Sequence, residues 1–102
     1  MNKIKSHQDL KKAVKSTRSV IMFSKPDCLH CSIVKTAIVS VEQQFPLIDF
    51  HYTEDLGFAK ELNIDAFPVL VFYEKGNEQG RLIGSGKVHL LKHIFNLWFF
   101  KE

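Results

Sequence analysis

The chain has 102 residues, of which 45% are apolar, 25% charged and 12% aromatic. This length suits a single domain, 1–102, because domains typically run about 100–150 residues, and the composition excludes a disordered or low-complexity protein. The net charge of +3 is too small and too dispersed to predict binding to nucleic acid or to an anionic membrane. No signal-peptide pattern and no run of about 20 apolar residues is present, so we expect a soluble, cytoplasmic protein.

The first half of the chain alternates predicted strands and helices. Ser6 and Asp9 resemble a capping box, which predicts a helix start near residue 7. The β-branched run at 19–24 is typical of a buried strand. Pro46 ends the helix that is predicted at 28–45. The elements expected in this half are strands at 2–5, 19–24 and 47–53, and helices at 7–16, 28–45 and 55–62.

The second half contains a predicted hairpin and an apolar last helix. Pro68 precedes an apolar strand at 69–73, and Lys75-Gly76-Asn77 is turn chemistry leading to a second strand at 80–84. The last helix is expected over 87–100, and its inward stripe would be Val88, Leu91, Ile94, Phe95 and Trp98. A second apolar face would pack against the sheet edge or form a homodimer or partner-docking surface, and it comprises Leu90, Leu97 and Phe100, with Phe99 beside them.

This order of elements predicts an α/β fold. Strands separated by helices imply right-handed parallel crossovers, whereas the late hairpin adds an antiparallel part. We therefore expect a central mixed sheet of four to five strands with helices on both faces.

The two cysteines, Cys28 and Cys31, are the strongest functional signal in the chain. Two cysteines are too few for a disulfide scaffold, so the fold must depend on its hydrophobic core. They lie at a predicted strand-to-helix junction, where free backbone N–H groups and the helix dipole stabilise a thiolate. A spacing of three puts both on one helix face, close enough for a short disulfide. Cys28 is then the exposed attacking thiol, and Cys31 is the shielded resolving thiol.

Other interpretations fit parts of this pattern. The pair could be half of a zinc site, but a structural zinc usually takes four ligands and no second cysteine pair exists. The two thiols could also be buried residues without chemistry. His89 and His93 lie four residues apart on the last helix, yet the flanking lysines favour a solvated face. We therefore expect no metal site.

Three segments resemble the thioredoxin family in their order and spacing. The run FSKPDCLHC at 23–31 is similar to the family's active-site segment, and IDAFPVLVF at 64–72 is similar to the strand that opens with a cis-proline. Lys75-Gly76-Asn77 followed by Gly84 resembles the final hairpin and its glycine. The resemblance implies a thioredoxin fold and a thiol–disulfide oxidoreductase that reduces protein disulfides. The cysteine pair would carry the electrons, so no bound cofactor is expected.

The resemblance also implies a substrate-binding element and partners. Pro68 would lie beside the cysteine pair, and Phe67 would offer its backbone and an apolar wall to an extended substrate segment. A trans-proline at a strand start is the alternative. The implied partners are disulfide-containing proteins, together with a flavin-dependent reductase or a low-molecular-weight thiol for recycling.

The chain departs from the family's pattern on both sides of the pair. Thioredoxins bury an acid where this chain has Met22; Asp49 on the next strand would either replace that acid or lie at the sheet rim. His30 resembles the histidine of disulfide isomerases and oxidases. It would stabilise the Cys28 thiolate and make the couple more oxidising than thioredoxin's, within about −180 to −270 mV, whereas Asp27 would oppose this.

These departures support an alternative function, a thioredoxin-like binding or adaptor module with weak or regulatory redox activity. Three features favour it: Met22, the apolar last helix, and the absence of the tryptophan that typical thioredoxins carry directly before the first cysteine. A glutaredoxin-like interpretation is weaker because no second glycine pair for glutathione follows the hairpin.

Overall fold

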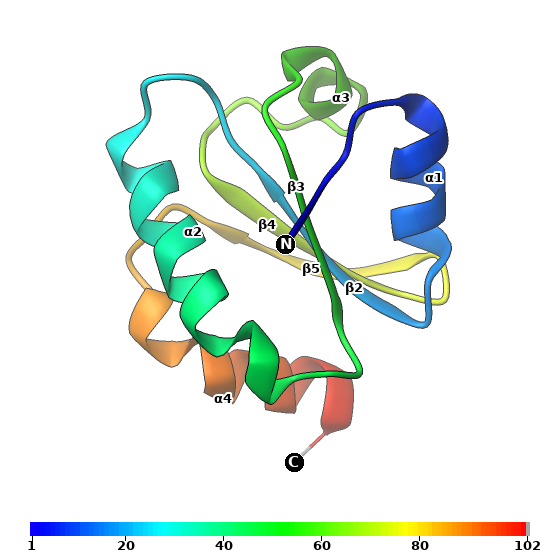
Figure 1. The fold of residues 1–102 in the computed structure, drawn as a ribbon, viewed down its shortest axis with the longest axis vertical. Coiled ribbons are helices and arrows are strands. Elements are labelled where there is room, and N and C mark those ends of the chain that lie inside the picture. The colour runs from blue at the N-terminus through cyan, green and yellow to red at the C-terminus, as the bar shows by residue number, and fades with distance from the viewer. Residues whose placement is uncertain (102) are drawn as a thin grey trace.

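The computed structural model describes residues 1–101 and contains a five-stranded mixed sheet between two layers of helices (Figure 1). The strands lie in the order β1-β3-β2-β4-β5. β3 is parallel to both β1 and β2, whereas β4 is antiparallel to β2 and β5. The predicted α/β architecture is confirmed. The strands are β1 (Asn2–Lys3), β2 (Arg18–Phe23), β3 (Asp49–Thr53), β4 (Val69–Glu74) and β5 (Asn77–Ile83).

The helices cover both faces of the sheet, α1 and α3 on one side and α2 and α4 on the other (Figure 1). Polar side chains cap the N-termini of α1 and α3: Ser6 Oγ accepts the N–H of Asp9 at 3.1 Å, and Asp55 Oδ1 accepts that of Gly57 at 2.8 Å. None of the helices within residues 1–101 is long and apolar enough to cross a bilayer. The helices are α1 (His7–Lys15), α2 (Leu29–Val41), α3 (Leu56–Glu61) and α4 (Leu91–Phe95).

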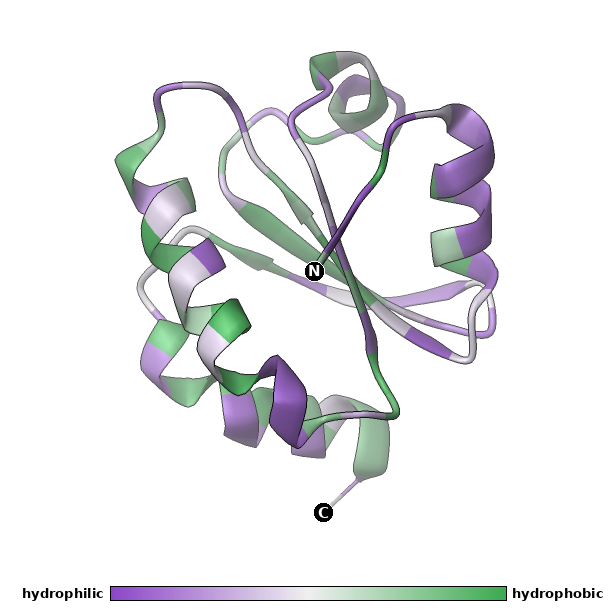
Figure 2. Cartoon of the chain, in the orientation of Figure 1, coloured by the Kyte–Doolittle hydropathy of each residue, from purple (hydrophilic) through white to green (hydrophobic). Residues whose placement is uncertain are grey.

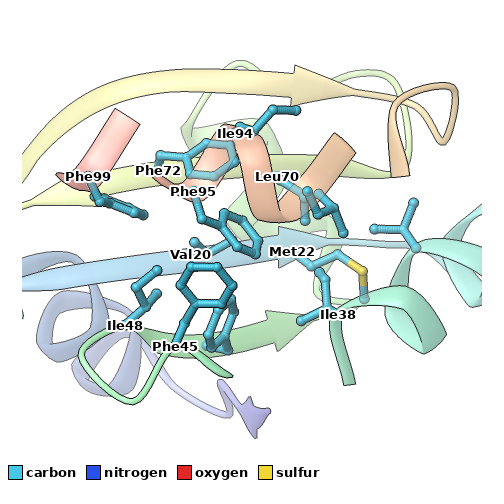
Figure 3. Close-up of a cluster of buried hydrophobic side chains, with 13 residues drawn as sticks. Val20, Met22, Ile38, Phe45, Ile48, Leu70, Phe72, Ile94, Phe95 and Phe99 are labelled. Atoms are coloured by element: carbon cyan, nitrogen blue, oxygen red, sulfur yellow. The ribbon is translucent and has the colours of Figure 1, made fainter. Parts of the chain in front are cut away.

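Each face of the sheet carries its own apolar core. β2 is apolar over 20–23 and β4 over 69–72 (Figure 2), and their side chains alternate between the two faces, which is typical of central strands buried on both sides. In the core under α2 and α4, the Phe95 ring is fully buried at 5.2 Å from Phe45 and 5.9 Å from Phe72 (Figure 3). These packed aromatic pairs hold the C-terminal segment against the sheet.

The C-terminal helix differs from the prediction. Instead of one helix over 87–100, the segment is a 3₁₀ turn (Val88–Leu90), α4 and a π-helical turn (Asn96–Phe100). Because the π turn contains more residues per turn, Phe99 turns into the core and Trp98 remains only partly buried. Trp98 packs against the core through Phe72, as the inward stripe predicts, whereas Phe99, expected beside the second apolar face, is buried in the core.

The hairpin also begins earlier than predicted. β5 starts at Asn77 rather than at residue 80, because Lys75 and Gly76 form a two-residue loop with φ of 52° and 89°. Two consecutive positive φ values suit a tight hairpin turn, and glycine takes the second at no steric cost. At the other edge, β1 is shorter than the predicted strand at 2–5.

Candidate redox site

Cys28 and Cys31 form a disulfide at the start of α2, with their Cα atoms 5.2 Å apart. Cys28 is the N-cap residue, and its Sγ accepts the backbone N–H of Cys31 at 3.2 Å. Cys31 is only 5% exposed, whereas Cys28 is half-buried. This agrees with the predicted difference in exposure. A negative charge on the Cys28 sulfur would face the free N–H groups of a 13-residue helix, which favours the thiolate.

The loop before Cys28 presents the pair at the end of the central strand. β2 is buried up to Ser24, whose backbone N–H donates to the Thr53 carbonyl at 2.9 Å. Lys25 and Pro26 then leave the sheet, and Asp27 adopts a left-handed φ of 56° with its side chain exposed. Aspartate tolerates this conformation better than most residues. The loop thus turns the chain from β2 into α2 directly at Cys28.

Pro68 lies at the same end of the sheet as the cysteine loop. The Phe67–Pro68 peptide bond is cis, Pro68 is buried and Phe67 is half-buried. Val69, the next residue, is paired with Phe23 at the last rung of the β2–β4 ladder. The Pro68 carbonyl accepts the N–H of Gly84 at 2.8 Å, which ties the proline loop to the end of β5.

His30 is exposed on the first turn of α2, and its Nδ1 lies 2.8 Å from the Ser85 hydroxyl. Ser85 directly follows Gly84 and is 55 residues away from His30 along the chain. Ser85 belongs to no motif in the sequence, because a serine after the hairpin glycine carries no pattern of its own. Only the folded chain brings it to the cysteine loop.

A cleft of about 530 Å³ opens beside the disulfide. Met22 and both cysteines line it, and Lys35 places its Nζ 4.1 Å from the centre of the Tyr52 ring at its wall. Lys35 lies four residues after Cys31 on α2, so the helical period in the sequence is a signal that the two residues share one face of the helix. The other charged residues that line the cleft are Lys3, Lys25, Asp27 and Glu54.

Asp49 does not replace the acid that is missing at Met22. It is exposed and pairs with Ser19 at the beginning of β2 and β3, whereas the disulfide follows the other end of these parallel strands. Because β2 and β3 run in the same direction, residues at the start of β3 cannot reach the end of β2. Met22 instead pairs with Tyr52, close to the cleft. The interpretation of Asp49 as a residue at the sheet rim is the correct one.

The remaining ionisable candidates lie away from the disulfide. His89 and His93 are both exposed, and within residues 1–101 no group of three or more His, Cys, Asp or Glu side chains is placed to hold a metal ion. Burial lowers the pKa of His51 and raises that of Tyr73, and a hydrogen bond to Glu78 raises the pKa of Arg81. None of these three lines the cleft beside the disulfide in the part of the chain described.

Comparison with known proteins gives consistent matches. The family profile of thioredoxin matches residues 2–96. A putative thioredoxin H10 from Arabidopsis thaliana is 29% identical over 76 residues, which cover 72% of this chain and 49% of that protein. The chain thus spans about half the length of this curated relative.

Solved structures match the fold over nearly the whole chain. Oxidised mitochondrial thioredoxin 3 from Saccharomyces cerevisiae has a TM-score of 0.82 at 24% identity, covering 94% of each chain. Thioredoxin O2 from Arabidopsis thaliana, in its oxidised state, has a TM-score of 0.80 at 22% identity, covering 93% of this chain and 90% of that one. Fasciola hepatica thioredoxin has a TM-score of 0.81 at 22% identity, covering 94% and 98%.

Proposed function

Because the chain belongs to the thioredoxin family, we propose that it is a thiol–disulfide oxidoreductase that acts on protein disulfides. The observation that carries this proposal is the Cys28–Cys31 disulfide, with the more accessible sulfur capping α2 and the other buried beneath it. Only an accessible sulfur can attack a protein disulfide, whereas a shielded one is protected from wasteful oxidation.

The proposed reaction starts from the reduced pair. The Cys28 thiolate attacks one sulfur of a substrate disulfide, a mixed disulfide forms, and the other substrate sulfur leaves as a thiolate that takes a proton. Cys31 then loses its proton and attacks the Cys28 sulfur, which releases the second substrate thiol. Two electrons pass to the substrate, and the protein ends with the Cys28–Cys31 disulfide seen in the structure. The cysteine pair itself carries the electrons, so the reaction needs no bound cofactor.

The substrate chain is proposed to dock along Phe67 and Pro68. Phe67 lies just beyond the β2–β4 ladder, which ends at the Phe23–Val69 pair, so an extended segment can add to its backbone. Two exposed apolar side chains flank this place: Leu29, 73% exposed, between the cysteines, and Ile83, 69% exposed, opposite Val69. We infer that disulfides with apolar neighbours are preferred.

Insulin reduction with dithiothreitol as electron donor tests the proposal. Wild-type protein should accelerate precipitation of the insulin B chain, and Cys28→Ser should abolish the acceleration. Cys31→Ser retains the attacking thiol, so after reduction and removal of dithiothreitol it should accumulate a mixed disulfide with insulin that non-reducing electrophoresis detects. Equal rates for wild type and Cys28→Ser would contradict the proposal.

Turnover also requires an electron donor. We propose that a flavin-dependent reductase or a low-molecular-weight thiol reduces the Cys28–Cys31 disulfide in a cytoplasmic setting. Supplying NADPH with a thioredoxin reductase, or glutathione alone, and following the loss of the disulfide by mass spectrometry separates these donors.

An adaptor function is the second candidate, and buried Met22 favours it because no carboxylate stands there to exchange a proton with Cys31. Leu90 and Leu97, 40% and 47% exposed, would supply a contact surface for a second copy or another protein. Because Phe99 is buried, this surface is smaller than the sequence suggested. Light scattering after size exclusion tests the dimer, and absence of turnover with every donor would favour the adaptor.

A further inference from the structure

The contact between His30 and Ser85 joins three segments that surround the disulfide. The Pro68 carbonyl accepts the Gly84 N–H at 2.8 Å, and Ser85 follows Gly84 and reaches His30 Nδ1 at 2.8 Å. His30 lies between the two cysteines. The proline loop, the end of β5 and the first turn of α2 are thereby connected through hydrogen bonds.

Ser85 is held in place independently of His30. The residue before it, Gly84, has a φ of 80° and donates its N–H to the Pro68 carbonyl. The Ser85 carbonyl in turn accepts the N–H of Val88 at 3.3 Å. Ser85 itself is half-buried. The Ser85 backbone is therefore held in one position, and its hydroxyl can fix the His30 ring. An exposed histidine without a partner would move among several rotamers.

The hydroxyl can keep this contact in both protonation states of the imidazole. It donates to Nδ1 when that nitrogen is unprotonated and accepts from it when the ring is protonated, because a serine hydroxyl is both donor and acceptor. Nε2 carries a proton in the neutral ring whose Nδ1 is unprotonated and in the protonated ring. The influence of a charge or dipole depends on distance, so fixing the His30 ring fixes its electrostatic effect on the sulfur of Cys28, two residues earlier on the same turn.

We propose that Ser85 is a positioning residue that holds His30 where its imidazole stabilises the Cys28 thiolate and so raises the reduction potential of the pair. This inference rests on the proposed function only in that the cysteine pair is redox-active. It assigns to Ser85 no contact with substrate and no part in proton transfer.

The test is the equilibrium constant of the isolated protein with glutathione, measured for wild type and variants. Ser85→Ala should shift the couple about threefold toward the disulfide, the size expected for losing one modest hydrogen bond. Ser85→Thr retains the hydroxyl and should restore the wild-type value. Ser40→Ala, which removes an exposed serine elsewhere on α2, should leave the constant unchanged.

A double-mutant cycle assigns the effect to His30. In a His30→Ala background, Ser85→Ala should cause no further shift, because the group that it positions is absent. The ¹⁵N shifts of the His30 ring should also show a changed tautomer balance in Ser85→Ala. A wild-type constant for Ser85→Ala, or a full threefold shift that persists without His30, would overturn the inference.

The same measurements separate this inference from the proposed function. The equilibrium constant requires no protein substrate, so a Ser85→Ala shift together with no insulin reduction would retain the positioning role and refute the reductase. Insulin reduction that depends on Cys28, together with no shift, would do the reverse. Far-ultraviolet circular dichroism of each variant shows whether the fold is retained, and Ser85→Gly, which also removes the hydroxyl, takes the place of Ser85→Ala if that variant does not fold.

Discussion

The Trp98 indole lies so close to Gly80 that a Cβ atom added there would meet its ring at 2.9 Å. The same ring packs edge-on against Phe72, with 4.5 Å between the centroids, and Phe72 is the cross-strand partner of Gly80. Glycine at position 80 therefore makes room on β5 for the only tryptophan of the chain. This packing holds the C-terminal π turn against the sheet.

Gly80→Ala should destabilise the protein by about 1–3 kcal/mol, because the added methyl group displaces the Trp98 ring. The free energy of unfolding in urea, followed by far-ultraviolet circular dichroism, measures the loss. Gly86→Ala is the matched control, since a Cβ there meets nothing within 4 Å. In a Trp98→Leu background the cost of Gly80→Ala should shrink, and equal costs in both backgrounds would refute the close contact.

His30→Pro should make the cysteine pair more reducing, by about tenfold in the equilibrium constant or about 30 mV. The substitution removes the imidazole that favours the Cys28 thiolate, and the first turn of α2 tolerates proline because its N–H groups lack helical partners. Equilibration with a reference thioredoxin gives the potential.

Asp27→Asn is the matched variant and should shift the potential in the opposite direction. It removes the carboxylate beside Cys28, and asparagine tolerates the left-handed φ of 56°. A shift of the same sign for both variants would show that the charges at 27 and 30 do not tune the pair.

Ile83→Lys should raise the KM for insulin several-fold while leaving the reduction of a small aromatic disulfide unchanged. The expected reason is that Ile83, opposite Val69, contacts the polypeptide around the substrate disulfide but not the sulfurs. Leu47→Lys is the control, because Leu47 is similarly exposed (66% against 69%) but precedes β3 at the other end of the sheet. Equal effects of the two lysines on KM would argue against docking at Ile83.

Acidification should destabilise the protein through His51. Burial lowers the pKa of this half-buried histidine below its ordinary value of 6.5, against an opposing effect of the Asp49 carboxylate. The unfolded chain therefore binds more protons, and stability falls as the pH drops from about 6.5 through the lower folded pKa. Urea unfolding of wild type and His51→Gln between pH 5 and 8 should show a shallower pH dependence for the variant. Identical slopes would contradict this assignment.

The sequence by itself determined the order of the elements and the redox pair. Ser6, Pro46 and the hairpin turn at Lys75–Gly76 act through backbone geometry and neighbouring hydrogen bonds, which are local and therefore legible in the chain. The spacing of Cys28 and Cys31 is also local, because one helical turn is enough to bring them together.

Only the tertiary structure decided which distant residues meet. Ser85 reaches His30, Asp49 lies at the far end of β3 from the disulfide, and the π turn buries Phe99 in the core that Trp98 packs against. Each outcome depends on strand register or on packing between segments far apart in the chain. Hydrophobic periodicity describes one element at a time and carries no information about such distances.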